Sequence, residues 1–128
     1  SEGILKSSHD LLILTDADCA PTSKDWIRDM VSHFTEERSV VLGYGAYKKI
    51  KKSFLNKLIR FETLLTAIQY FSYAKMNKAY MGVGRNIAYK KEEFIKAKGF
   101  TQHDQVISGD DDLFISQIAR SNNIAVCY

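Results

Sequence analysis

The chain has 128 residues, of which 45% are hydrophobic, and a formal net charge of +3. This length fits a single domain over residues 1–128 with its own core, and so mild a positive charge does not call for a nucleic-acid partner. Cys19 and Cys127 lack the spacing of a metal site or a CxxC motif, and residues 1–10 lack the apolar segment of a signal peptide, so we expect a cytoplasmic location.

Residues 1–9 are expected to be a linker or the tail of a helix, and the first predicted strand follows at Leu11 to Leu14. Four consecutive aliphatic residues favour a strand buried on both faces, as in a parallel sheet covered by helices. Asp16 and Asp18 come next, at the edge where such sheets bind ligands. Two residues apart in extended backbone, their side chains can converge on one divalent cation, Mg²⁺ or Mn²⁺. The alternative is that they form a turn and cap the next helix.

That helix is predicted after Pro21, with Thr22 or Ser23 as its cap and apolar positions up to residue 34. A second strand is predicted at residues 40–47. The basic turn at residues 48–52 is expected to be a solvated loop, with a phosphate or membrane-surface contact as the alternative. From residue 53 a long helix with a wide apolar face is predicted, either as the largest piece of core or as an interface.

In the second half, residues 81–86 interrupt the helical pattern before a short strand at 87–89 and a helix at 91–98 that Gly99 ends. A polar loop at 101–107 leads to another helix, and a last strand is predicted at 124–128. Strands that alternate with helices indicate an α/β fold.

Gly82 and Gly84, followed by Asn86, can let the backbone approach a sugar or phosphate closely, or can mark a tight turn. After Gly109 come three carboxylates at the expected start of a helix, Asp110, Asp111 and Asp112. Adjacent like charges raise one another's proton affinity, which suits a general base, although the helix dipole alone can explain acidic residues there. His103 in the polar loop is a candidate for a further metal ligand.

Taken in order, LLILTDADCAPTSKDW, MGVGRNIAYKKEEFIKAKGF and SGDDDLF resemble the inverting family 2 glycosyltransferases of the GT-A fold. The resemblance implies a GT-A-like, Rossmann-related mixed sheet flanked by helices. It implies that Asp16 and Asp18 hold a divalent metal on the diphosphate of a nucleotide sugar. It also implies that residues 82–86, with Arg85 among them, line the donor and acceptor pocket.

The resemblance further implies that Asp111 is the catalytic base, with Asp110 in place of the family's usual Glu. Asp112 is the weaker candidate for the base and is expected to contact substrate. The implied reaction is an in-line displacement with inversion, in which a saccharide or lipid-linked acceptor attacks the anomeric carbon, as in polysaccharide biosynthesis.

The strand that binds the nucleotide base in this family does not precede Ser1, and the Gln-x-x-Arg-Trp pattern of processive members is not found. We therefore expect a fragment truncated in its nucleotide-binding half, inactive by itself and prone to self-association. Its parent is expected at the cytoplasmic face of a membrane, held there by parts that are not present here.

Two other classes remain open. Haloacid dehalogenase phosphatases also end a strand in DxD, but Ala20 stands where they favour Thr or Val, and their late acidic residues are more widely spaced. The other alternative is a non-catalytic interaction module that uses the helix at residues 54–74 as its partner surface.

Overall fold

The computed structural model describes residues 2–97 and 110–128, and these residues form one mixed sheet. Its strands are β1 (Leu11–Leu14), β2 (Val40–Gly43), β3 (Ile87–Lys90) and β4 (Ile124–Cys127), in the order β1-β3-β2-β4. β3 runs antiparallel to β1 and β2, whereas β4 runs parallel to β2. The expected α/β class, with a mixed sheet flanked by helices, is confirmed.

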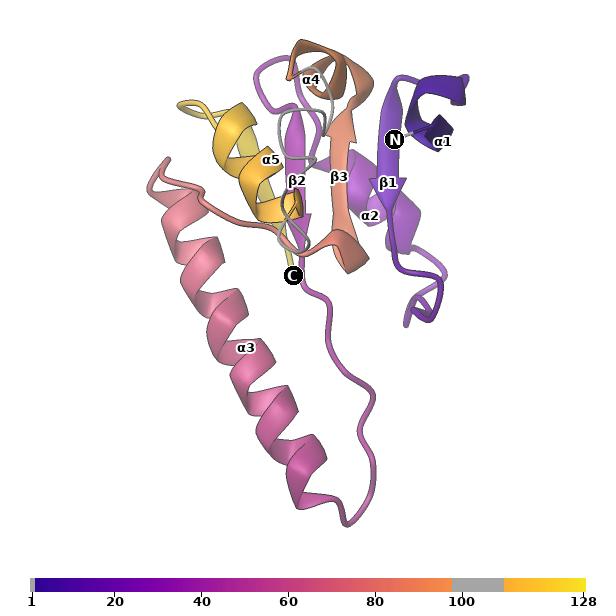
Figure 1. Cartoon of the computed structure of the whole chain (residues 1–128), viewed down its shortest axis with the longest axis vertical. Helices are drawn as coiled ribbons and strands as arrows, with labels where there is room; N and C mark the ends of the chain where they lie inside the picture. The colour runs from indigo at the N-terminus through magenta and orange to yellow at the C-terminus, as the bar shows by residue number, and fades with distance from the viewer. Residues whose placement is uncertain (1, 98–109) are drawn as a thin grey trace.

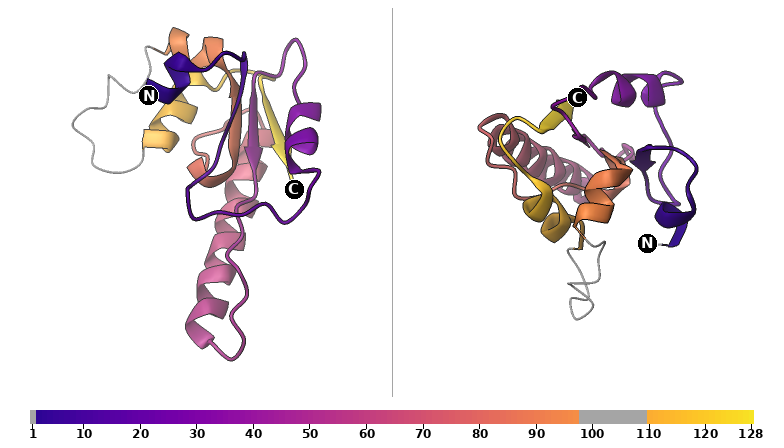
Figure 2. Two further views of the ribbon diagram at one scale, coloured as in Figure 1. Left: turned by 90° about the vertical axis from the view of Figure 1, so that its right-hand side faces the viewer. Right: turned by 90° about the horizontal axis from the view of Figure 1, so that it is seen from above.

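The helices cover both faces of this sheet (Figures 1 and 2). They are α1 (Glu2–Lys6), α2 (Trp26–Ser32), α3 (Phe54–Lys75), the short 3₁₀ helix η1 (Gly84–Asn86), α4 (Lys91–Lys96) and α5 (Asp110–Ile118). α2 packs on one face, whereas α3, α4 and α5 pack on the other.

The alternation of side chains along β2 divides the core into two layers. Val40 and Leu42 point into the larger layer, which contains Tyr70 of α3 and Phe114 of α5. Val41 points the other way, into the smaller layer around Met30 of α2. Strand β2 is therefore fully buried at the centre of the fold.

β1 is a strand, as predicted, but the prediction that it is buried on both faces of a parallel sheet is wrong. It lies at one end of the described sheet, pairs antiparallel with β3, and leaves Leu11 exposed and its other residues half-buried. Leu12 and Leu14 border the larger core layer and Ile13 the smaller one. An edge strand with apolar neighbours on both sides thus has the same sequence pattern as a central one.

Ser53 caps α3, because its Oγ accepts a hydrogen bond from the backbone N–H of Asn56 at 3.1 Å. Of the two alternatives predicted for this helix, core or interface, core applies mainly to its second half, whose buried residues are Ala67, Tyr70, Phe71 and Ala74. The first half, with the loop before it, projects beyond the sheet (Figure 1). Among the described residues, no helix is both long and apolar enough to cross a membrane.

Some predicted boundaries shift. α2 begins at Trp26, and Ser23 accepts a hydrogen bond from the backbone of Asp25 rather than capping the helix. β2 ends at Gly43, four residues before the predicted end of the strand. Gly99, Gly109 and the polar loop with His103 lie outside the described residues.

Candidate functional site

A cleft of about 230 Å³ lies beside the carboxyl end of β1. Asp16 comes from the loop after β1, residues 81–85 from the segment before β3, and Asp112 from the first turn of α5. The structure thus brings together parts of three motifs that are far apart in the sequence.

Asp112 is fixed at the cleft by Gly82, whose backbone N–H donates a hydrogen bond to the carboxylate. Burial raises the pKa of Asp112, and this hydrogen bond opposes the shift. Gly82 has no room for a side chain, because a Cβ there would lie 2.9 Å from Leu42 and 3.1 Å from Ile115. A side chain at position 82 would therefore push against core side chains next to the backbone that bonds to Asp112.

Asp16 and Asp18 lie in a turn, because the backbone N–H of Cys19 donates to the carbonyl of Asp16 at 3.0 Å. The predicted extended backbone is therefore wrong here, but the side chains converge nevertheless. One ligand atom from each of Asp16, Asp18 and Cys19 lies within 4.8 Å of the others, and all three residues are exposed. Of the two aspartates, Asp16 also lines the cleft.

Asp110 and Asp111 form the start of α5, as the sequence predicts. Their side chains lie outside what the structure describes. Asp112, in the same turn, is the member of the acidic cluster whose contact with the cleft is seen.

Arg85 lies between this cleft and a second cavity. Its Nε donates to the carbonyl of Gly45 at 2.9 Å, and its guanidinium lies 4.9 Å from the centre of the Tyr47 ring. A Cβ on Gly45 would come within 2.5 Å of the Arg85 side chain, so the glycine makes this contact possible. Arg85 is thereby held in place as a cation at the cleft.

Asn86 does not line the cleft. Its Oδ1 accepts from the indole Nε1 of Trp26 and its Nδ2 donates to the carbonyl of Tyr44, each at 3.0 Å. The side chain therefore connects α2 to the segment after β2, and it stabilises the backbone next to the cleft.

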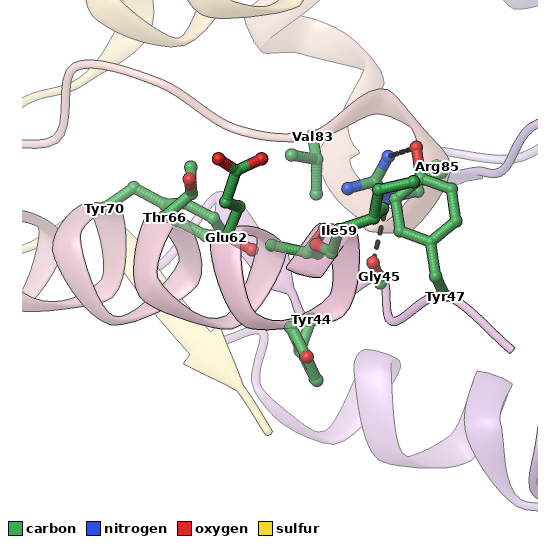
Figure 3. Close-up of a pocket in the computed structure, with 10 residues that line it drawn as sticks. Tyr44, Gly45, Tyr47, Ile59, Glu62, Thr66, Tyr70, Val83 and Arg85 are labelled. Atoms are coloured by element: carbon green, nitrogen blue, oxygen red, sulfur yellow. Dashed lines mark hydrogen bonds between the residues drawn. The ribbon is translucent and has the colours of Figure 1, made fainter. Parts of the chain in front are cut away.

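The second cavity has a volume of about 260 Å³ and lies between α3 and residues 83–85 (Figure 3). Its lining combines aromatic rings with hydroxyl and charged groups from Tyr44, Tyr47, Glu62, Thr63, Thr66, Tyr70 and Arg85. The Tyr70 hydroxyl donates to the Gly43 carbonyl at 2.9 Å, and burial raises the pKa of Tyr70 to about 12. It therefore stays a neutral hydrogen-bonding group.

Sequence reasoning did not identify this cavity, since its residues come from α3 and from the segment after β2. The signal available was the pair Tyr44 and Tyr47 directly after a buried strand, with Gly45 between them. Nothing local in the sequence shows that Glu62 and Thr66 of α3 face these tyrosines.

Residues 1–98 match the family described as glycosyl transferase family 2. No curated protein matches the chain. The mixed sheet flanked by helices is consistent with a GT-A-like fold.

Proposed function

Because the chain belongs to glycosyl transferase family 2, we propose that its cleft is the centre of a metal-assisted, inverting transfer of sugar from a nucleotide-diphosphate sugar to an acceptor hydroxyl. Family membership supports glycosyl transfer in general and implies a nucleotide-sugar donor and an acceptor. One observation carries the finer proposal: a single cleft contains Asp16, the segment 82–85 and Asp112.

The donor's diphosphate is placed beside Arg85 and the backbone of Gly84. Arg85 carries the positive charge that an anionic diphosphate requires, and its contacts with Gly45 and Tyr47 fix it before substrate binds. Gly84 lines the cleft without a side chain, so the sugar or phosphate can approach the main chain.

Asp16 and Asp18 are the residues that would hold the divalent cation. Their carboxylate oxygens suit Mn²⁺ or Mg²⁺, whereas the thiol of Cys19 suits softer metals. Because all three groups are exposed, they can supply part of a ligand set that substrate phosphate and water complete. When bound, the cation offsets the charge that develops on the departing diphosphate.

We assign Asp111 as the base, with Asp110 beside it, because α5 begins at these residues and its first turn reaches the cleft through Asp112. The base takes the proton of the acceptor hydroxyl while the oxygen attacks the anomeric carbon. The bond to the diphosphate breaks on the opposite side, so the configuration inverts. Asp112, held by Gly82, contacts the sugar or the acceptor.

The acceptor is placed in the second cavity, which meets the cleft at Val83 and Arg85. The Tyr47 ring offers a face for a sugar to stack on, while Glu62 and Thr66 offer hydrogen bonds to its hydroxyls. These groups suit a saccharide, free or lipid-linked.

We place the reaction in the cytoplasm, in a parent protein at the cytoplasmic face of a membrane. The free thiols of Cys19 and Cys127 fit a reducing compartment.

Binding of uridine and guanosine diphosphate to the parent protein, measured by titration calorimetry with and without MnCl₂, tests the metal and donor assignment. We expect manganese-dependent binding that weakens about tenfold or more in Asp16→Asn. The control is Asp29→Asn, an exposed aspartate of α2, which should bind as the original chain does. Equal binding by both variants, or binding that ignores manganese, would overturn the proposal.

Sugar transfer tests the assignment of Asp111 as the base separately from nucleotide binding. In the parent protein, Asp111→Asn should keep the manganese-dependent binding and abolish sugar transfer to an acceptor. The phosphatase alternative is not favoured by the family match, and it would require release of phosphate from p-nitrophenyl phosphate that depends on Asp16.

A further inference from the structure

The projecting half of α3 carries an apolar surface on the side that faces away from the sheet. Phe54 is 79% exposed, Leu55 65% and Phe61 62%. A stripe of large apolar side chains continues from there along the helix at alternating spacings of four and three residues, which we call the outer stripe: Phe54, Leu58, Phe61, Leu65 and Ile68. Single exposed apolar residues need no explanation, but a contiguous stripe indicates a surface that meets a partner.

The outer stripe lies opposite the buried face of the helix. Ala67, Tyr70 and Ala74 pack against the core, and at 100° per residue they point away from Phe61 and Leu65. The sheet therefore cannot cover the stripe without unpacking α3. A partner for the stripe would therefore have to come from outside the described residues.

The same end of the molecule is strongly basic. Residues 45–61 contain no acidic residue, and their basic side chains are Lys48, Lys49, Lys51, Lys52, Lys57 and Arg60. The five lysines are exposed, and within the described part of the chain none of them forms an ion pair.

Partly buried hydrogen bonds of Asn56 hold the basic loop against the first turn of α3 on the buried side of the helix, while Lys57 lies beside the outer stripe on the helix itself. The Asn56 side chain accepts from the backbone N–H of Ile50 at 2.8 Å and donates to the carbonyl of Lys48 at 3.0 Å. Asn56 is itself buried. The basic loop is therefore folded back on the first turn of α3, with Ile50 and Tyr47 adding further exposed apolar surface.

We propose that the outer stripe and the basic loop together dock on a lipid bilayer with anionic headgroups. Apolar side chains that reach the acyl boundary, bordered by lysines that contact phosphate, are the two features by which helices lie in a membrane interface. A second copy packed in parallel on the stripe would instead bring two sets of basic side chains together. This proposal does not depend on the glycosyltransferase assignment.

Docking in this way has a geometric consequence for the second cavity. Ile59, Glu62 and Thr66 line that cavity from the flank of the same helix turns that carry Leu58, Phe61 and Leu65. The cavity would thus lie beside the same helix turns as the stripe but open on a different side of α3 from the one that faces the bilayer.

Co-sedimentation with vesicles tests the proposal. We expect the chain to bind vesicles of phosphatidylglycerol mixed with phosphatidylcholine, to bind phosphatidylcholine alone more weakly, and to be released by salt. Phe54→Ser with Phe61→Ser should lower the partition coefficient about tenfold or more. The matched control is Ile27→Ser with Ile95→Ser, since these residues are 60% and 58% exposed on α2 and α4 and should not affect binding.

Lys48→Glu with Lys51→Glu should remove the preference for anionic vesicles. Circular dichroism checks that each variant keeps its fold. Equal loss in the control pair, or no vesicle binding by the original chain, would overturn the proposal. So would a concentration-dependent dimer in sedimentation velocity that Phe54→Ser abolishes in the absence of any lipid binding, because the stripe would then belong to a second copy.

Discussion

The indole Nε1 of Trp26 donates a hydrogen bond to Oδ1 of Asn86 at 3.0 Å, across 60 residues of sequence. Through its Nδ2, the same amide donates to the carbonyl of Tyr44. One side chain thus joins α2, the segment after β2 and the turn of η1 just behind the cleft. The position of residues 82–85, and with it the shape of the cleft, depends on this pair.

Asn86→Ala leaves the indole N–H without its partner in a half-buried position. We expect the free energy of unfolding to fall by about 1 to 3 kcal/mol, measured by urea denaturation. Trp26→Phe removes the donor instead, and the double variant should lose less than the sum of the two single losses. Strict additivity would contradict the coupling.

Gly43→Ala should destabilise the chain through the same amide. A Cβ at Gly43 would lie 2.3 Å from Nδ2 of Asn86, so the side chain must move. We expect a loss of about 1 to 3 kcal/mol in urea unfolding, and a smaller one when Asn86→Ala is already present. Gly3→Ala is the control, because a Cβ there meets nothing within 4 Å.

Asp112 makes stability depend on pH. Burial raises its pKa in the folded chain, so the folded state holds the proton more tightly than the unfolded state. Ionisation therefore lowers the free energy of unfolding as pH rises above the ordinary value of 3.8, and the full penalty is present above the raised pKa.

Asp112→Asn removes this penalty and keeps an oxygen that can accept from Gly82. The urea midpoint should rise at neutral pH, and the difference from the original chain should disappear below pH 3.8. A lower midpoint at neutral pH would show that the charge itself stabilises the fold.

A variant of Cys19 can distinguish the binding of hard metals from that of soft metals at the proposed cation site. Cys19→Ser should leave thermal stabilisation by MnCl₂ unchanged and reduce stabilisation by CdCl₂, because thiolate prefers the softer ion. Differential scanning fluorimetry with both salts measures this. Loss of the manganese response in Cys19→Ser would mean that the site is built around the thiol.

The order of strands and helices could be read from the sequence because each is a local pattern. The apolar runs at Leu11–Leu14 and from Val40 to Leu42 are examples. The sequence could not show which faces of these strands and helices pack against one another. β1 is placed beside β3 by pairing with residues 87–90, and no local signal distinguishes that edge position from a central one.

For the candidate site too, the sequence predicted the residues but not the long-range contacts that hold them. Asp16, the glycines at 82 and 84, and Asp112 were identified by residue type, and the fold brings them to one cleft. Arg85 and Asn86 were identified as well, but their anchors, Gly45 and Trp26, depend on contacts 40 and 60 residues away. The α3 pattern left two alternatives open, core or interface, because an apolar helix face has the same sequence pattern whether the core or an outside partner covers it.

The strand order has a consequence for how the chain acquires its fold. β2 pairs with β4 in the register Val40 with Ile124, and β1 pairs with β3 in the register Leu11 with Lys90. During synthesis on the ribosome, neither early strand has its neighbour until residues 87–90 have emerged. High contact order of this kind slows folding, so unpaired apolar strands persist in the nascent chain and are the segments on which a chaperone would act.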